Sequence, residues 1–134
     1  MNDEYFSISL RVWHPSKSSN LIITTIGLEA EARHSVGAQR RNPAGKILGG
    51  TYRNTYCSFP LLDKFPGKFT ESLPEILRRL HSHGKFLKMV SLEGGRSELF
   101  VGIFTDASTG FSLDLGLIST MAELSLELSV DVYY

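Results

Sequence analysis

Apolar and polar residues alternate at both ends of the chain. Apolar side chains occupy every second position from Phe6 to Val12, and again from Leu126 to Val132. A period of two is that of a β-strand with one face on a core and the other toward solvent. The sequence therefore predicts strands over residues 5–13 and 126–133.

A helical period marks the middle of the chain. The positions i, i+3, i+4 and i+7 are apolar from Leu73 to Leu80, which is the stripe of an amphipathic helix. Ser72 and Glu75 match a capping box, with Pro74 tolerated in the first turn. Gly84 is expected to end this helix, because glycine adopts the left-handed conformation at little cost.

Two shorter helices are predicted on either side of it. Residues 16–26 favour a helix capped by Ser16 or Ser18 and ended by Gly27. A third helix is expected to start at the cap Asp114, with a buried stripe formed by Leu117, Ile118 and Met121.

Further strands are predicted over residues 30–35, 51–59, 85–92 and 98–105. A tight turn at Gly94 and Gly95 is expected to join the last two. The strand over 98–105 is apolar on both faces, which favours an interior place in the sheet. Residues 36–50, with four glycines and one proline, are typical of a mobile surface loop, and Pro60 and Pro66 bracket a predicted linker.

These elements predict one α+β domain over residues 1–134. Each end runs from a strand through a helix to another strand, which suggests two split βαβ units. Right-handed crossovers would place the helices on one face of a mostly antiparallel sheet. The expected architecture is a ferredoxin-like sandwich with extra strands.

Charge is balanced over the whole chain but not along it. Fourteen basic and fourteen acidic residues give a net charge of zero, yet no acidic residue lies between Glu31 and Asp63, and no basic residue follows Arg96. Such a split serves an anionic partner at one end and a cationic partner at the other. Alternatively, the two segments lie side by side and neutralise each other.

Catalytic and metal-binding motifs are absent from the sequence. There is no HExxH, CxxC, DxDxDG or glycine-rich phosphate motif, so we predict no catalytic residue, no metal and no cofactor. Cys57 is the only cysteine, which indicates a reducing compartment, and no apolar run approaches the ~20 residues that span a membrane. We expect a cytoplasmic protein without a membrane partner.

Aromatic and basic residues gather around the predicted loop. The candidate partner-binding residues are Trp13, Arg40, Arg41, Lys46, Tyr52 and Arg53. Aromatic rings beside arginines suit single-stranded nucleic acid, but they are also the residue types enriched at protein–protein contacts. Because the net charge is zero, the sequence gives no general attraction to a polyanion and favours a protein partner.

Several segments resemble a known family. These are residues 98–104 (ELFVGIF), 110–113 (GFSL), 121–124 (MAEL) and 126–133, together with Ile26-Gly27-Leu28 and the basic stretch around His34 and Gly37. In these segments the chain is similar to the bacterial domain-of-unknown-function family four-two-seven-nine. The resemblance implies a shared fold and a bacterial origin, and it implies no activity.

Three functions remain open from the sequence. The first is a non-enzymatic protein-binding module, such as a toxin-neutralising immunity protein. The second is a small-molecule or anion sensor of ferredoxin-like type, for which a homodimer is one arrangement. The third is an enzyme whose site is assembled from distant residues, for example around His34, His81 or Cys57.

Overall fold

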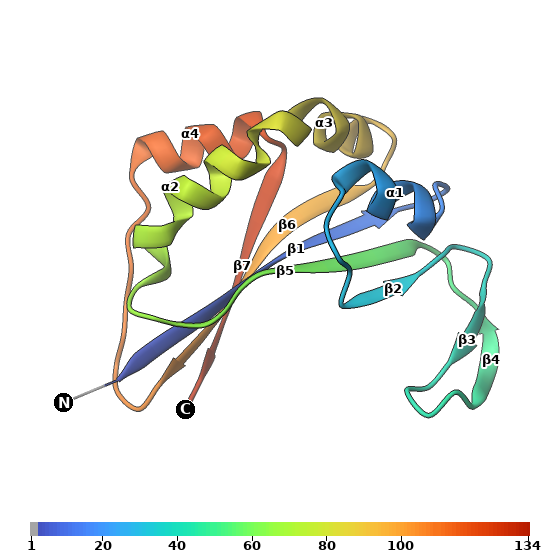
Figure 1. The fold of residues 1–134 in the computed structure, drawn as a ribbon, viewed down its shortest axis with the longest axis horizontal. Helices are drawn as coiled ribbons and strands as arrows, with labels where there is room; N and C mark the ends of the chain where they lie inside the picture. The colour runs from blue at the N-terminus through green and yellow to red at the C-terminus, as the bar shows by residue number, and fades with distance from the viewer. Residues whose placement is uncertain (1–2) are drawn as a thin grey trace.

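A computed structural model describes residues 3–134, which form a mixed five-stranded sheet with helices on one face (Figure 1). The elements in chain order are β1 (Glu4–His14), α1 (Ser19–Ile26), β2 (Ala32–His34), β3 (Gln39–Arg41), β4 (Ile47–Thr51), β5 (Thr55–Pro66), α2 (Phe69–Leu80), the 3₁₀ turn η1 (His81–His83), α3 (Gly84–Leu92), β6 (Arg96–Thr105), α4 (Leu115–Glu123) and β7 (Leu126–Tyr133). The fold is therefore α+β, as the sequence predicts.

The strand order of the main sheet is β2-β5-β1-β6-β7. β1 lies at the centre and pairs antiparallel with β5 and with β6, while β2 pairs antiparallel with β5. β2 thus runs parallel to β1 with β5 between them, and β6 runs parallel to β5 with β1 between them. β7 is added beyond β6 as a parallel neighbour, after the helix α4.

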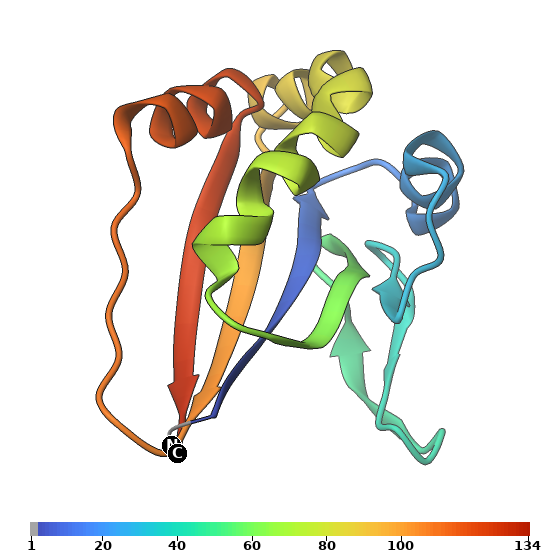
Figure 2. The ribbon, with the colours of Figure 1, turned by 60° about the vertical axis from the view of Figure 1, so that its left-hand side comes forward.

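All the α-helices pack over the same face of the sheet, and Figure 2 shows this layer from a second direction. Between the two layers lies an apolar core to which β1 contributes Phe6, Ile8, Leu10 and Val12, each exposed by 1% or less. The predicted alternation of β1 is confirmed, since the intervening side chains point to the opposite face. No helix among residues 3–134 is long and apolar enough to cross a membrane.

Local capping agrees with the sequence at two helices. The Ser18 side chain accepts a hydrogen bond from the Leu21 N–H at the start of α1, and Gly27 ends that helix with a φ of 73°. Asp114 caps α4 by accepting from the Leu117 N–H at 2.8 Å. Ile118, expected in the buried stripe of α4, is instead 50% exposed.

The prediction of a strand over residues 85–92 is wrong, because this segment forms the helix α3. Gly84 adopts right-handed helical angles, so it lets the chain continue through η1 into α3. Leu87 and Val90, three residues apart, are the buried side chains of α3. The predicted capping box also fails, since α2 begins at Phe69 and Ser72 lies inside it.

The predicted linker between Pro60 and Pro66 is also wrong, because β5 runs through Pro60 and ends only at Pro66. β2 pairs with only three residues of β5, up to Ser58. Beyond that point β5 has a strand on one side alone among the described residues, and edge positions tolerate proline. The predicted mobile loop over residues 36–50 likewise contains structure, namely the β3–β4 hairpin.

Candidate functional site

The sheet face turned away from the helices, called here the open face, carries no covering layer (Figure 1). Residues paired on neighbouring strands point to the same side of a sheet. The strand register therefore arranges the open-face side chains in rows that cross the strands. These rows bring together residues far apart in the sequence.

One row is aromatic. His34 pairs with Tyr56, Tyr56 with Trp13, and Trp13 with Arg96, across β2, β5, β1 and β6. The Trp13 and Tyr56 ring centroids lie 5.1 Å apart, and the Arg96 guanidinium lies 3.8 Å from the Trp13 centroid. This is the contact distance of a cation–π interaction. The row forms one packed aromatic and cationic surface.

Tyr52 extends this row toward the hairpin. Its ring stacks on His34 with centroids 3.6 Å apart and planes within 7° of parallel. The Tyr52 backbone donates to Ala38 and accepts from Gly37, which fixes the base of the β3–β4 hairpin. Burial of the His34 ring lowers its pKa, and a hydrogen bond with the Asn54 backbone only partly offsets this effect.

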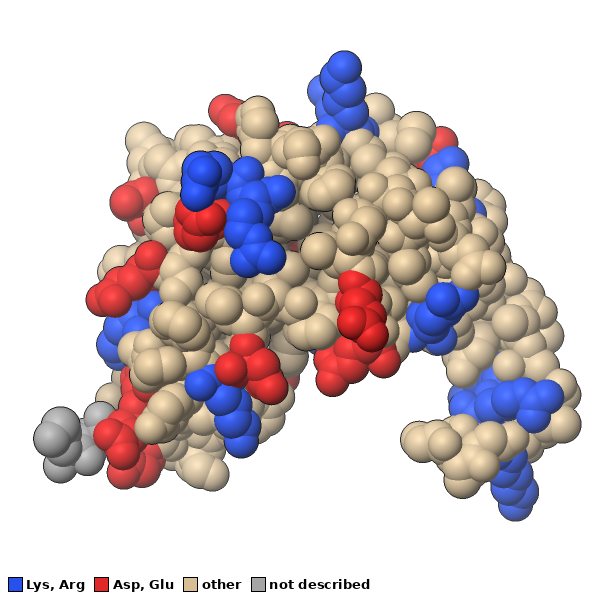
Figure 3. Space-filling view, viewed as in Figure 1, with Lys and Arg blue, Asp and Glu red and all other residues tan. Residues whose placement is uncertain are grey.

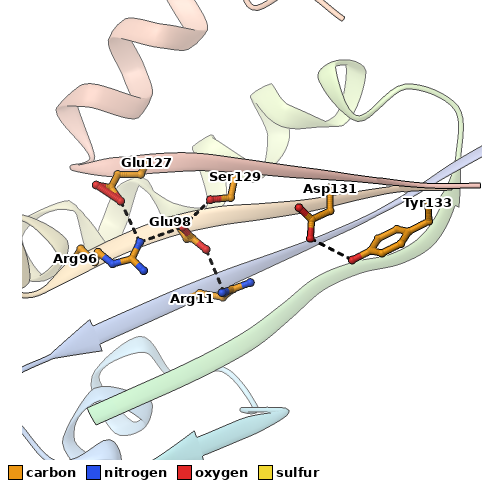
Figure 4. A network of polar contacts seen from close by, with 7 residues as sticks. All are labelled: Arg11, Arg96, Glu98, Glu127, Ser129, Asp131 and Tyr133. Carbon is orange, nitrogen blue, oxygen red and sulfur yellow. Dashed lines mark hydrogen bonds and ion pairs between the residues drawn. The ribbon is translucent and has the colours of Figure 1, made fainter. Parts of the chain in front are cut away.

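The neighbouring row is charged (Figure 4). Glu98 is 3% exposed, yet it lies on the open face, with its Oε1 atom 3.1 Å from the Arg11 Nε. This nitrogen is buried and its N–H is not aligned for a hydrogen bond, so the contact is one of charge. The Arg11 guanidinium also lies 4.5 Å from the Phe100 centroid, which shields the ion pair from water.

Glu98 has further partners on β6 and β7. The Ser129 hydroxyl donates to its Oε2 at 2.8 Å, and the Arg96 Nη1 lies 3.3 Å from the same oxygen. Arg96 also contacts the exposed Glu127 at 3.3 Å. Figure 4 shows this network spanning β1, β6 and β7. A network of ion pairs and hydrogen bonds therefore holds the open-face side chains in place at this end.

The β3–β4 hairpin projects from the edge of the sheet on the side of the open face (Figure 1), and Figure 3 shows basic side chains on it. Arg40 and Arg41 lie on β3, and each donates one hydrogen bond to a carbonyl of the hairpin itself. Lys46 lies at the turn and Arg53 lies beyond β4, both exposed. None of these four residues joins an ion pair with any residue in 3–134.

The acidic C-terminal segment lies at the opposite side of the sheet. Glu98 and Glu127 are neutralised by Arg11 and Arg96, not by the hairpin. The alternative that the two segments neutralise each other is therefore wrong.

No family model, curated protein or solved structure matches this chain. The function has to be inferred from its own geometry.

The side chains that could act in catalysis or metal binding do not come together in one site. Cys57 is fully buried, and loss of hydration raises the pKa of its thiol to about 11. His81 and Asp114 line one groove between α2 and α4, but no hydrogen bond or ion pair joins them. Within residues 3–134, no three His, Cys, Asp or Glu side chains are grouped to hold a metal ion.

The predicted partner-binding residues are only partly brought together. Trp13 and Tyr52 enter the same aromatic row, whereas Arg40, Arg41 and Lys46 lie on the hairpin and Arg53 lies just beyond it. Sequence reasoning missed Arg11, Arg96 and Glu98. The alternation of β1 and β6 marks the face of these residues, but the strand order that joins them is not visible locally.

Proposed function

We propose that the protein is a non-enzymatic protein-binding domain that engages its partner through the open face and the basic hairpin. The observation that carries this proposal is the aromatic row with its arginine, uncovered and already ordered. Trp, Tyr and Arg are enriched among the residues that dominate the energetics of protein interfaces, and the Tyr and Trp rings bury a large area at a small entropic cost.

The charge of the open face favours protein over nucleic acid. Arg11 and Arg96 are matched there by Glu98 and Glu127, and Asp131 adds a further negative charge. A polyanion requires a continuous basic track, which this face lacks. The hairpin alone is basic, and it suits an acidic patch on a protein.

Toxin neutralisation is one role that such a surface fits, because occluding a partner needs only a rigid complementary face. We infer that the strand plan is ferredoxin-like, with the hairpin and α4–β7 as additions, and that the chain is related to the bacterial family it resembles.

The single buried thiol of Cys57 fits action in the cytoplasm.

To test this proposal, the protein is co-expressed with the proteins that its neighbouring genes encode, and the purified material is examined for a stoichiometric complex. A monodisperse protein that forms no such complex with any of these products would contradict the proposal.

The hairpin variant Arg40→Ala/Arg41→Ala then probes the surface. Its free energy of unfolding should change by less than about 0.5 kcal/mol, because exposed substitutions are rarely costly. Its association with an acidic partner should slow, and the salt dependence of association should flatten. The matched control Lys85→Ala/Lys88→Ala removes two exposed charges from α3 and should leave binding unchanged. Unaltered association in a well-folded hairpin variant would exclude the hairpin from the interface.

A second function is supported by the groove between α2 and α4. Its volume is about 490 Å³, and its lining combines apolar Pro74, Leu77 and Leu117 with polar groups such as His81. This size and composition suit a small molecule. A thermal-shift screen tests it, because a ligand at 100 times its Kd adds about 2.7 kcal/mol of stability. No shift with nucleotides, amino acids and phosphates would count against this function.

A further inference from the structure

The open face is hollowed at the side of β5. A pocket of about 480 Å³ lies there between β1, β5 and the connection from α1 to β2. Ser7, Ser9 and Pro60 are among its lining residues, and their small side chains leave the space free. The connection forms the outer wall, because the Glu31 N–H donates to the Ser58 carbonyl and holds the chain along β5.

The walls of this pocket are acidic. Glu29 and Glu31 come from the connection and Asp63 from β5, and no basic residue is among the lining. The Ser7 hydroxyl donates to the Asp63 carboxylate at 3.0 Å and orients it. Figure 3 shows acidic side chains at the rim of the hollow beneath the sheet, across the gap from the basic hairpin.

These three carboxylates have no cationic partner among residues 3–134. The adjacent Lys64 directs its ammonium over the Phe104 ring, 5.3 Å from the centroid. Arg11, the next cation along β1, is held by Glu98. The pocket therefore keeps a negative charge that no basic side chain among residues 3–134 neutralises.

We propose that this pocket receives a lysine or arginine side chain presented by the protein partner. Such a side chain matches both parts of the pocket: its aliphatic stem packs on Leu62 and Pro60, and its charged head meets the carboxylates. The inference rests on the proposed function and deepens it. With a basic hairpin on one side and an acidic pocket on the other, the partner carries both charges and docks in one orientation.

The experiment uses a fragment in place of the unidentified partner. The ¹⁵N-labelled protein is titrated with N-acetyl-arginine methylamide, and with N-acetyl-glutamate methylamide as a control, while amide chemical shifts are recorded. The arginine fragment should give saturable shifts at Ser7, Ser9 and Leu62, and the glutamate fragment should give none. The variant Glu29→Gln/Glu31→Gln should weaken fragment binding by at least about fivefold.

The matched control is Glu71→Gln/Glu123→Gln, which removes two exposed carboxylates from α2 and α4 and should leave the titration unchanged. Shifts that do not saturate, that spread over all acidic regions, or that persist in Glu29→Gln/Glu31→Gln overturn the inference. Because the titration needs no partner, its result tests the role of the pocket independently of the proposed protein-binding function. Fragment binding without any protein complex refutes only the proposed function, whereas a complex without fragment binding refutes only the pocket's role.

Discussion

Glu98 is the residue on which the open face depends most. Its carboxylate is buried beside Arg11, Arg96 and Ser129. Glu98→Ala should lower the free energy of unfolding by about 2–3 kcal/mol, because it leaves the partly buried Arg11 uncompensated. Glu127→Ala, which removes an exposed partner of Arg96, should cost less than about 0.5 kcal/mol. Urea unfolding measures both, and equal costs would show that Glu98 is an ordinary surface charge.

His34 makes the stability of the folded protein depend on pH. Its pKa is lowered in the folded state from the ordinary 6.5, because burial disfavours the charged ring. The unfolded chain therefore binds more protons in this range, so the stabilisation is fully present above pH 6.5 and is lost as the pH falls from there through the lower pKa of the folded state. His34→Phe, which keeps a ring on Tyr52, should show a smaller loss of stability between pH 7.5 and 5. Parallel pH profiles of the two proteins would exclude this role for His34.

Among the elements, the turn from α3 to β6 has the least tolerance for change. A Cβ at Gly95 would lie 2.4 Å from the Trp13 carbonyl oxygen and 2.8 Å from the Val90 Cγ1. Gly95→Ala should therefore destabilise the protein by about 3 kcal/mol, since backbone atoms would have to move. Gly49→Ala on β4 is the control, because nothing lies within 4 Å of its Cβ position. If the midpoint of thermal unfolding shifts equally in both variants, the close packing around Gly95 is not the reason for a glycine at this position.

The sequence predicted elements well where one local pattern dominated. β1 and β7 alternate cleanly, and Ser18, Gly27 and Asp114 act at the helix ends expected of them. It failed where the deciding contact is distant. Gly84 is compatible with either a stop or a continuation, and only packing against the sheet selects the helix α3. Pro60 is compatible with a strand only because β2 is short.

The candidate site was harder to predict for the same reason. Trp13 and Tyr52 stand out by residue type, but the row that joins them requires the pairing of β1 with β5 and of β5 with β2. Glu29, Glu31 and Asp63 meet only because the connection after α1 follows the edge of β5.

On the scale of the whole molecule, the helices cover one face of the sheet, and the aromatic row and the Glu98 network lie on the other. The basic hairpin and the acidic pocket flank this open face at a distance from each other (Figure 3). Although its net charge is zero, the chain thus presents a surface that is basic on one side and acidic on the other. Such a separation of charge is what an oriented protein contact requires.

The most direct test maps the partner's footprint on this surface. Chemical shifts of the labelled protein are compared before and after it forms a complex with the captured partner. We predict that the largest changes fall on the Trp13 indole, on Arg11 and Tyr56, and along the hairpin over residues 39–51. Changes confined to the helix layer, for example around the exposed Leu115 and Ile118 of α4, would contradict the central claim.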